Sequence, residues 1–172
     1  MPAYVALLRA VNVGGTGKLP MAELKSMCVA EGFVHVETYI ASGNVVFASD
    51  RSAKSVKAAL EQRLEAHMGK PVGVILRTAE DMVAILRANP FADAPANHTY
   101  VLFLDAPPLE TTLDNLRGQA DEEVKLGTRE LYVRYPDGQG KSKLVIPAAK
   151  TGTARNMNTV AKLAAMAAKL KG

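Results

Sequence analysis

The sequence predicts a mixed α+β protein made of two tandem lobes, each with an antiparallel sheet. Over residues 1–77, short apolar runs and helical patterns follow one another in the order β-α-β-β-α-β, and residues 99–172 follow the order β-α-β-β-α. This order is typical of ferredoxin-like folds. The 172 residues accommodate two small lobes, and 48% hydrophobic with 22% charged residues is the composition of a chain that buries a core.

The first predicted lobe, residues 1–77, begins with an apolar run that indicates a buried strand. Pro20 follows a glycine-rich loop and suits the first turn of a helix. Residues 42–44, Ser-Gly-Asn, provide the turn of a tight hairpin, and Ser52 is a favourable N-cap for the second helix. The expected strands are residues 3–10, 35–41, 45–49 and 72–76, and the expected helices are residues 20–32 and 52–69.

Residues 78–98 are expected to connect the lobes as a helix followed by a linker. Thr78 and Asp81 have the spacing of a capping box at the start of this helix, and the proline at position 90 is expected to stop it. The stretch 91–97 is rich in Ala, Pro, Asn and Asp, a composition that favours a linker.

The second predicted lobe, residues 99–172, repeats the order of elements without visible sequence identity to the first. Its duplication is therefore a prediction about topology alone. The sequence shows no clear final strand for this lobe. The expected strands are residues 99–104, 123–126 and 131–135, and the expected helices are residues 109–118 and 159–170.

Composition restricts the cellular setting. No stretch approaches the roughly 20 uninterrupted apolar residues of a membrane-spanning helix, so a membrane protein is not expected. Cys28 is the single cysteine and cannot form an internal disulfide, which favours a reducing compartment, the cytoplasm.

Positive charge is concentrated at the C-terminal end. Residues 139–172 carry seven basic residues and no acidic one, whereas residues 1–138 carry an excess of acidic residues. Such a block is typical of a surface that binds anions or nucleic acid. The alternative, which we favour for Lys162, Lys169 and Lys171, is the solvated face of a last helix.

Topology gathers polar residues at one edge of the first predicted sheet. A right-handed crossover makes the first two strands parallel, so the exit of the first strand and the turn of the hairpin lie at the same edge. Anion sites are built from such groups: amide and hydroxyl side chains, cationic side chains, and exposed backbone at glycines beside a helix N-terminus. The alternative is that these residues only shape the turns. The candidate residues are Arg9, Asn12, Gly14, Gly15, Lys18, Ser42, Gly43 and Asn44.

A second polar cluster, residues 153–159, precedes the last predicted helix. Arg155 has the planar guanidinium that binds carboxylates and phosphates through two hydrogen bonds, and Asn156 offers an amide beside it. A structural role is equally open, because Asn156 can cap the helix and Arg155 can pair with a carboxylate of the other lobe.

Other site chemistries lack their residue patterns. Position 12 is Asn and position 19 is Leu, which excludes a Walker loop at residues 12–19, and Pro20 excludes a dinucleotide fingerprint. No His or Cys spacing marks a metal site, no cofactor is implied, and no catalytic constellation is complete. The RNP signature is absent and the aromatic residues stand singly, so nucleic-acid binding has little support.

Four segments together resemble the bacterial domain-of-unknown-function family 1697: MPAYVALLRAVNVGG, KLPMAELK, ETYIASGNVVF and TARNMNTVAKL. The resemblance implies two ferredoxin-like lobes and no settled activity. Met157 departs from the family pattern, which usually has tryptophan there, so a stacking role at this position is not expected. The family motif falls on Arg9, Asn12, Gly14, Gly15, Ser42, Gly43, Asn44, Thr153, Arg155, Asn156, Asn158 and Thr159.

The leading functional hypothesis is a module that binds a small anionic ligand, with phosphorylated ligands among the candidates, at the edge of Asn12 and Ser42, with Arg155 and Asn156 contributing if the lobes meet there. One alternative is a structural or interaction protein whose polar motifs lock the two lobes together. Another is an enzyme of undetermined class. The sequence determines neither the ligand nor the oligomeric state.

Overall fold

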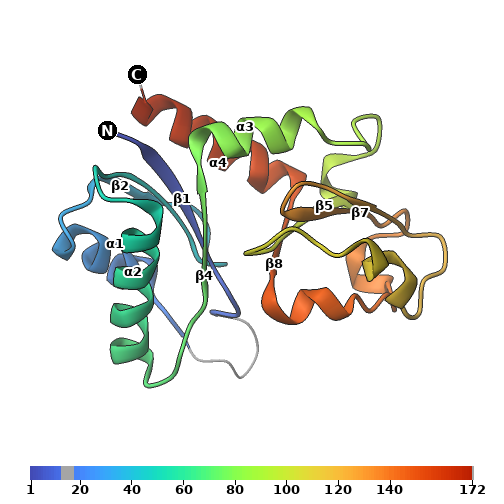
Figure 1. Ribbon diagram of the computed structural model, residues 1–172, viewed down its shortest axis with the longest axis horizontal. Coiled ribbons are helices and arrows are strands. Elements are labelled where there is room, and N and C mark those ends of the chain that lie inside the picture. Colours follow the sequence, from blue (N-terminus) through green and yellow to red (C-terminus); the bar gives the residue numbers. More distant parts are fainter. Residues whose placement is uncertain (13–17, 172) are drawn as a thin grey trace. The chain divides into compact units, whose positions relative to one another are not determined.

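The computed structural model describes residues 1–12 and 18–171 and has a mixed α+β architecture with two four-stranded antiparallel sheets (Figure 1). The predicted fold class is confirmed at this level. The chain divides into two compact units. Unit 1 comprises Met1–Met82 and Leu163–Gly172, and unit 2 comprises Val83–Lys162.

Unit 1 contains the first sheet, in which every pair of neighbouring strands is antiparallel. Strand β1 is central, and the strand order is β2-β3-β1-β4. The elements of this part of the chain are β1 (Ala3–Leu8), α1 (Met21–Ala30), β2 (Val34–Thr38), β3 (Asn44–Ala48), α2 (Ala53–Met68) and β4 (Val74–Thr78).

Helices α1 and α2 cover one face of this sheet (Figure 1). Alternate residues of β1, namely Tyr4, Ala6 and Leu8, pack into the core beneath the helices. The intervening Val5 and Leu7 are also fully buried, so both faces of β1 are removed from water. This explains why β1 is a continuous apolar run in the sequence rather than an alternating one.

Local sequence signals set several boundaries in unit 1. Ser52 is the N-cap of α2, where its Oγ accepts a hydrogen bond from the amide of Ser55 at 3.2 Å, and Gly69 ends α2 with a left-handed φ of 74°. The first strand ends at Leu8, two residues earlier than predicted, because the backbone of Ala10 turns into the left-handed region with φ 51°.

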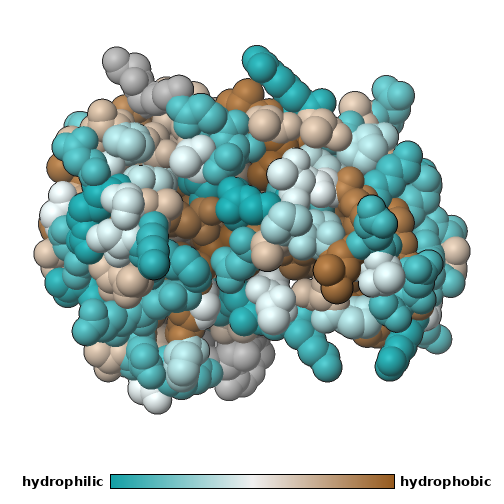
Figure 2. Space-filling view, in the orientation of Figure 1, coloured by the Kyte–Doolittle hydropathy of each residue, from teal (hydrophilic) through white to brown (hydrophobic). Residues whose placement is uncertain are grey.

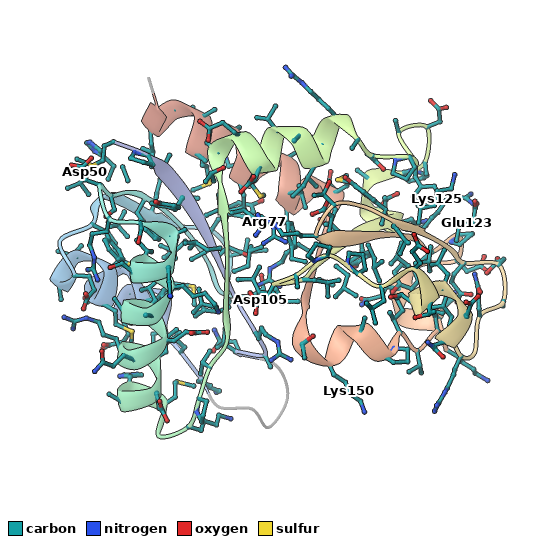
Figure 3. The ribbon with its side chains drawn as sticks, viewed as in Figure 1. Asp50, Arg77, Asp105, Glu123, Lys125 and Lys150 are labelled. Carbon is teal, nitrogen blue, oxygen red and sulfur yellow. The ribbon has the colours of Figure 1, made fainter. Side chains whose placement is uncertain are left out.

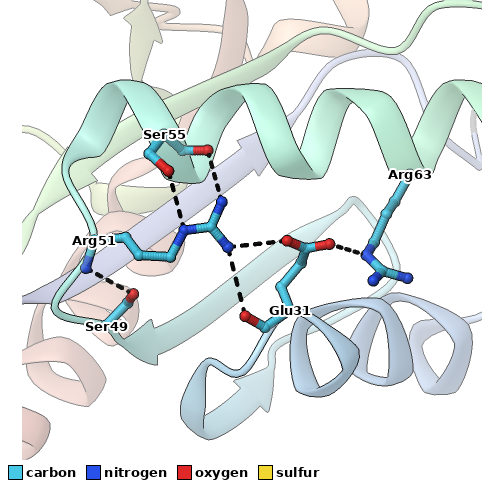
Figure 4. A network of polar contacts seen from close by, with 5 residues as sticks. All are labelled: Glu31, Ser49, Arg51, Ser55 and Arg63. Carbon is cyan, nitrogen blue, oxygen red and sulfur yellow. Dashed lines mark hydrogen bonds and ion pairs between the residues drawn. The ribbon is translucent and has the colours of Figure 1, made fainter.

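A polar network centred on Glu31 connects the end of α1, helix α2 and the segment between β3 and α2 (Figure 4). The Glu31 carboxylate pairs with Arg51 at 2.9 Å and with Arg63. The Arg51 guanidinium also donates to Ser55 and lies 5.6 Å from the centre of the Phe33 ring. The hydrogen bonds from Arg51 and Arg63 lower the pKa of Glu31.

We expect Glu31→Gln to lower the free energy of unfolding by about 1 kcal/mol at pH 7, the upper range for a partly exposed ion pair. Because the pKa of Glu31 is lowered in the folded protein, its contribution is present at neutral pH and is lost as the pH falls through the folded pKa. Urea unfolding from pH 7 to pH 3 measures this. The exposed Glu37→Gln on β2 is the control, and a stability difference for Glu31→Gln that persists undiminished in acid would contradict the assignment.

Helix α3 (Ala79–Arg87) follows β4 directly and begins with the predicted capping box. The amide of Thr78 donates to Asp81 Oδ2 at 2.9 Å, and the amide of Asp81 donates to Thr78 Oγ1 at 3.1 Å. The helix ends three residues before Pro90, in agreement with the sequence signal.

Unit 2 contains the second sheet, again antiparallel throughout, with strand order β6-β7-β5-β8. Strand β5 therefore has the central place that β1 has in the first sheet. Short 3₁₀ turns occupy much of the connecting chain. The strands and the final helix are β5 (Thr99–Phe103), β6 (Glu123–Leu126), β7 (Glu130–Arg134), β8 (Thr153–Asn156) and α4 (Met157–Lys171).

Two predictions for the second lobe are wrong. A final strand exists: β8 pairs with β5, with Val101 opposite Arg155. No local pattern marks this strand, because its four residues, Thr-Ala-Arg-Asn, show neither an apolar run nor β-branched enrichment. The predicted helix at residues 109–118 is a 3₁₀ helix over Glu110–Asn115.

Buried and exposed contacts hold unit 2 together. The Tyr132 hydroxyl donates to the carbonyl of Ile85 at 2.8 Å. On the edge strand β6, Glu123 pairs with Arg134 at 2.8 Å, and the Lys125 ammonium lies 5.6 Å from the centre of the Phe91 ring. Figure 3 labels Glu123 and Lys125, which belong to the edge strand β6.

Polar residues cover most of the molecular face in Figure 2, with apolar patches between them. Some large apolar side chains are exposed, and Leu109 is the most exposed of them at 74%. Within the described residues, no helix has the length and apolar character needed to cross a membrane.

Candidate functional site

The exit of β1 and the β2–β3 hairpin meet at one edge of the first sheet, as the topology predicted. Leu7 is opposite Asn44 in the sheet register, and the amide of Leu8 donates to the carbonyl of Gly43 at 2.9 Å. On the other side of β1, the amide of Arg9 donates to the carbonyl of Gly73 at 2.9 Å. We call residues 9–12, 39–44 and 68–73 the β1 exit edge.

The side chain of Asn12 holds this edge together through hydrogen bonds. Its Nδ2 donates to the carbonyl of Leu19 at 2.8 Å and to that of Ala41 at 2.7 Å, and its Oδ1 accepts from the amide of Leu19 at 2.7 Å. One amide therefore joins the two ends of the loop after β1 and ties both to the hairpin. Because both Nδ2 hydrogens and Oδ1 are engaged, Asn12 positions the backbone.

Asn44 and Gly43 shape the neighbouring hairpin. The buried Asn44 amide donates to the carbonyl of Tyr39 at 3.0 Å and to the hydroxyl of Ser42 at 2.9 Å. Gly43 has φ 90°, and a Cβ at this position would lie 2.7 Å from Val11 Cγ2 and 2.9 Å from Leu8 Cβ. Glycine is required here both by the backbone conformation and by the close approach of β1.

Backbone strain is concentrated at the same edge. Of the four described non-glycine residues with positive φ, three lie here: Ala10 at 51°, Asn12 at 56° and Ile40 at 49°. A left-handed conformation is unusual for alanine and is a genuine outlier for the β-branched isoleucine. Such conformations cost on the order of 1–3 kcal/mol each and occur preferentially at functional sites.

A cationic pocket of about 170 Å³ opens beside the strained residues. Arg9 and Lys70 supply its positive charge, and the segment that leads into β4 forms the rest of the wall. Gly73 lets the Arg9 side chain lie against the backbone, since a Cβ there would be 2.9 Å from Arg9 Cδ. The full lining is Arg9, Ala10, Met68, Lys70, Pro71, Val72 and Gly73.

The structure brings together Arg9, Asn12, Ser42, Gly43 and Asn44 from the predicted site. Gly14 and Gly15 lie outside the described residues. Lys18 lies before α1, at the end of the loop that follows β1. The sequence patterns did not point to Lys70 and Gly73. The order of strands could have indicated them, because β4 pairs with β1 and the start of β4 therefore lies at the exit of β1.

Arg155 and Asn156 belong to unit 2 and have local structural partners. The buried Arg155 guanidinium donates to Thr153 Oγ1 at 2.6 Å and to the carbonyl of Ala154 at 2.9 Å, and burial lowers its pKa to about 10. Asn156 Oδ1 accepts from the amide of Thr159 at 3.0 Å, as in a helix cap. A contribution of these residues to the Asn12 edge stays a prediction.

The side-chain surroundings bear on thiol chemistry and on metal binding. Cys28 is buried, and burial raises its pKa to about 12, so the thiol is protonated at neutral pH and has little nucleophilic character. No group of three or more His, Cys, Asp or Glu side chains suited to a metal ion occurs within residues 1–12 and 18–171.

Comparison with known proteins identifies the family. The model of the "protein of unknown function (DUF1697)" family matches residues 1–132. The chain belongs to this family. Among solved structures, a conserved bacterial protein from Streptococcus pneumoniae has a similar structure, with a TM-score of 0.80 and 27% sequence identity over 96% of this chain and 98% of that one. The comparison with curated proteins gives no match.

The similarity to the Streptococcus protein extends across both units of the DUF1697 chain. Neither the family description nor the description of the Streptococcus protein as a conserved bacterial protein states an activity or a ligand.

We expect Asn12→Ala to lower the free energy of unfolding by about 1–3 kcal/mol, because it leaves backbone groups of Leu19 and Ala41 without their partner. Denaturant unfolding of the full chain measures this. Asn158→Ala is the matched control, since Asn158 is exposed in the first turn of α4. Equal stability of the two variants would show that Asn12 does not fasten the edge.

Proposed function

We propose that this protein binds a small anionic ligand, of the phosphorylated class, in the pocket of Arg9 and Lys70 at the β1 exit edge. The observation that carries the proposal is that two cationic side chains, a pocket and strained backbone occur together at one edge of the first sheet. The centre of this site lies on the β4 side of β1, whereas the sequence placed it on the hairpin side.

The chemistry of the pocket suits a phosphate or carboxylate group. The Arg9 guanidinium is planar and can donate two parallel hydrogen bonds to such a group, while the Lys70 ammonium adds a flexible point charge. The volume of about 170 Å³ is below the ~300–1,000 Å³ of pockets for drug-sized ligands. The proposal therefore concerns a small anion or the anionic end of a larger molecule.

The strained backbone supports this function by fixing the position of Arg9. Ala10 and Asn12 flank Val11 in left-handed conformations, and the hydrogen bonds of Asn12 hold that arrangement. A side chain whose backbone is held in one conformation loses less entropy when it binds a ligand. Asn12 is thus a positioning residue in this proposal, and Arg9 and Lys70 are the binding residues.

A structural role for the polar motifs, in which they lock the two lobes together, is the second proposal. A structural role of the side chains is favoured by Asn12, whose amide groups are all engaged with backbone of unit 1, and by Arg155, which donates to its own strand in unit 2. The contact between the lobes is the proposed part. This proposal predicts that substitutions at the motifs lower the melting temperature. It also predicts that no anion changes the melting temperature of the wild-type chain.

The topology supports a finer description of the fold, which we also propose. The two strand orders, β2-β3-β1-β4 and β6-β7-β5-β8, correspond strand for strand. Strands β4 and β8 each carry a buried arginine opposite a valine of the central strand: Arg77 opposite Val5, and Arg155 opposite Val101. We propose two tandem ferredoxin-like lobes, residues 1–77 and 99–172, joined by residues 78–98.

A cytoplasmic location is likewise a proposal. It is supported by Cys28, a free cysteine buried in the apolar core of unit 1, which suits a reducing compartment.

The anion proposal is tested by titrating the full chain with inorganic phosphate and pyrophosphate at constant ionic strength. Isothermal titration calorimetry and amide chemical shifts provide the readout. We expect saturable binding with shifts at Gly73, and at least a tenfold weaker affinity for the Arg9→Gln/Lys70→Gln variant, since both cationic donors are lost. Lys54→Gln on α2 is the control for nonspecific charge, because Lys54 is exposed and outside the pocket. Wild-type affinity in the double variant would exclude the site.

Gly73→Ala tests the geometry of the pocket without changing its charge. The added methyl group must displace the Arg9 side chain, so we expect phosphate affinity to fall several-fold while the fold is retained. Gly140→Ala is the matched control, because a Cβ at Gly140 meets no atom within 4 Å. If Gly73→Ala binds phosphate as tightly as the wild type, the position of Arg9 is not what creates the site.

A further inference from the structure

Unit 2 contains a second pocket that the anion proposal does not use. Three segments surround a cavity of about 160 Å³: residues 118–122 before β6, residues 135–138 after β7, and residues 141–143. All three segments belong to unit 2. The cavity is bounded by both acidic and basic side chains, in contrast to the cationic pocket of Arg9 and Lys70.

Glu122 provides a fixed negative charge in the wall. The residue is only 6% exposed; its Oε1 accepts from the amide of Ala120 at 2.6 Å, and its Oε2 accepts from the Ser142 hydroxyl. These hydrogen bonds, that of Ser142 first, lower the pKa of Glu122, so the carboxylate is ionised at neutral pH. Both donors are neutral, and no cationic side chain of the described chain pairs with this carboxylate.

Four further charged side chains line the same cavity, and none of them forms an ion pair with another described residue. Asp121 and Asp137 are acidic, and Lys141 and Lys143 are basic. Across the parts of the chain that the structure describes, none of the four side chains has an ion pair or a side-chain hydrogen bond, although charges of both signs border one pocket. The cavity therefore offers carboxylates for a cation and ammonium groups for an anion.

The wall of this pocket is well fixed. The backbone at Arg117 and Val145 forms a reciprocal pair of hydrogen bonds of 3.0 and 2.7 Å. Next to this pair, Gly118 has φ 67°, and a Cβ there would be 2.2 Å from the carbonyl oxygen of Lys143, so only glycine allows the two segments to approach. Segments 117–118 and 143–145 are thus held together before any ligand arrives.

We propose that this pocket binds a small zwitterion of the free α-amino acid class. We expect the ammonium group of the ligand to pair with the carboxylates of Asp121, Asp137 and Glu122, and its carboxylate to pair with the ammonium groups of Lys141 and Lys143. A ligand that carries both charges satisfies both sets of side chains at once, whereas a simple cation or anion leaves one set unused. The small volume restricts the ligand to amino-acid size.

The test uses three molecules of similar size on the full chain: alanine, ethylamine, which lacks the carboxylate, and propionate, which lacks the ammonium group. Amide chemical shifts and calorimetry at constant ionic strength measure binding. We expect saturable binding of alanine with shifts at Gly118 and Gly138, and at least tenfold weaker binding of the other two. Ethylamine binding as tight as alanine would overturn the proposal in favour of a simple cation site, and no saturation by alanine would overturn it outright.

Two variants of the pocket complete the experiment. Asp137→Asn and Lys143→Met each remove one exposed charge and are each expected to weaken alanine binding at least fivefold. Asp114→Asn and Arg87→Met are the matched controls, since both residues are exposed in unit 2 away from this pocket. Alanine affinity unchanged in both pocket variants would overturn the assignment of the charges. The phosphate titration of the Arg9 pocket is independent of this result.

Discussion

The side-chain amide of Asn12 is the contact on which the β1 exit edge depends. It replaces backbone hydrogen bonds that the chain cannot make after β1, because Ala10 and Asn12 have left β-sheet geometry. These hydrogen bonds hold Asn12 against Leu19 and Ala41 and so stabilise the left-handed conformations of Ala10 and Asn12. With it, the position of Arg9 is fixed by β1 on one side and by Asn12 on the other.

This arrangement separates residues that shape the edge from residues that can bind. Asn12, Gly43 and Asn44 satisfy backbone groups or permit close packing, and their polar atoms are used for that purpose. Arg9 and Lys70 border an open pocket and carry the charge. A polar motif in a sequence can therefore be essential for a binding site without contributing any of the atoms that bind.

The two proposed pockets differ in electrostatic character for local reasons. Among its described lining residues, the Arg9 pocket has basic side chains and no acidic one, which suits an anion. In the pocket of unit 2, Glu122 is held ionised by neutral donors, and acidic and basic residues stand on the same rim. The C-terminal excess of positive charge thus does not produce a uniformly cationic surface, since Lys141 and Lys143 line a pocket together with carboxylates from earlier in the chain.

Periodicity and contacts between residues close in the chain were enough to predict the α+β class, the β2–β3 hairpin, the capping box at Thr78 and the N-cap of α2. Chain order also placed Asn12 and Ser42 at one edge, since it governs the handedness of a crossover. Only the tertiary structure shows the strand β8, because its polar residues become a strand by pairing with β5. Only the tertiary structure shows that Arg9, Lys70 and Gly73 line one pocket. Arg9 and Lys70 are about sixty positions apart, and no local pattern encodes which distant side chains a sheet edge brings together.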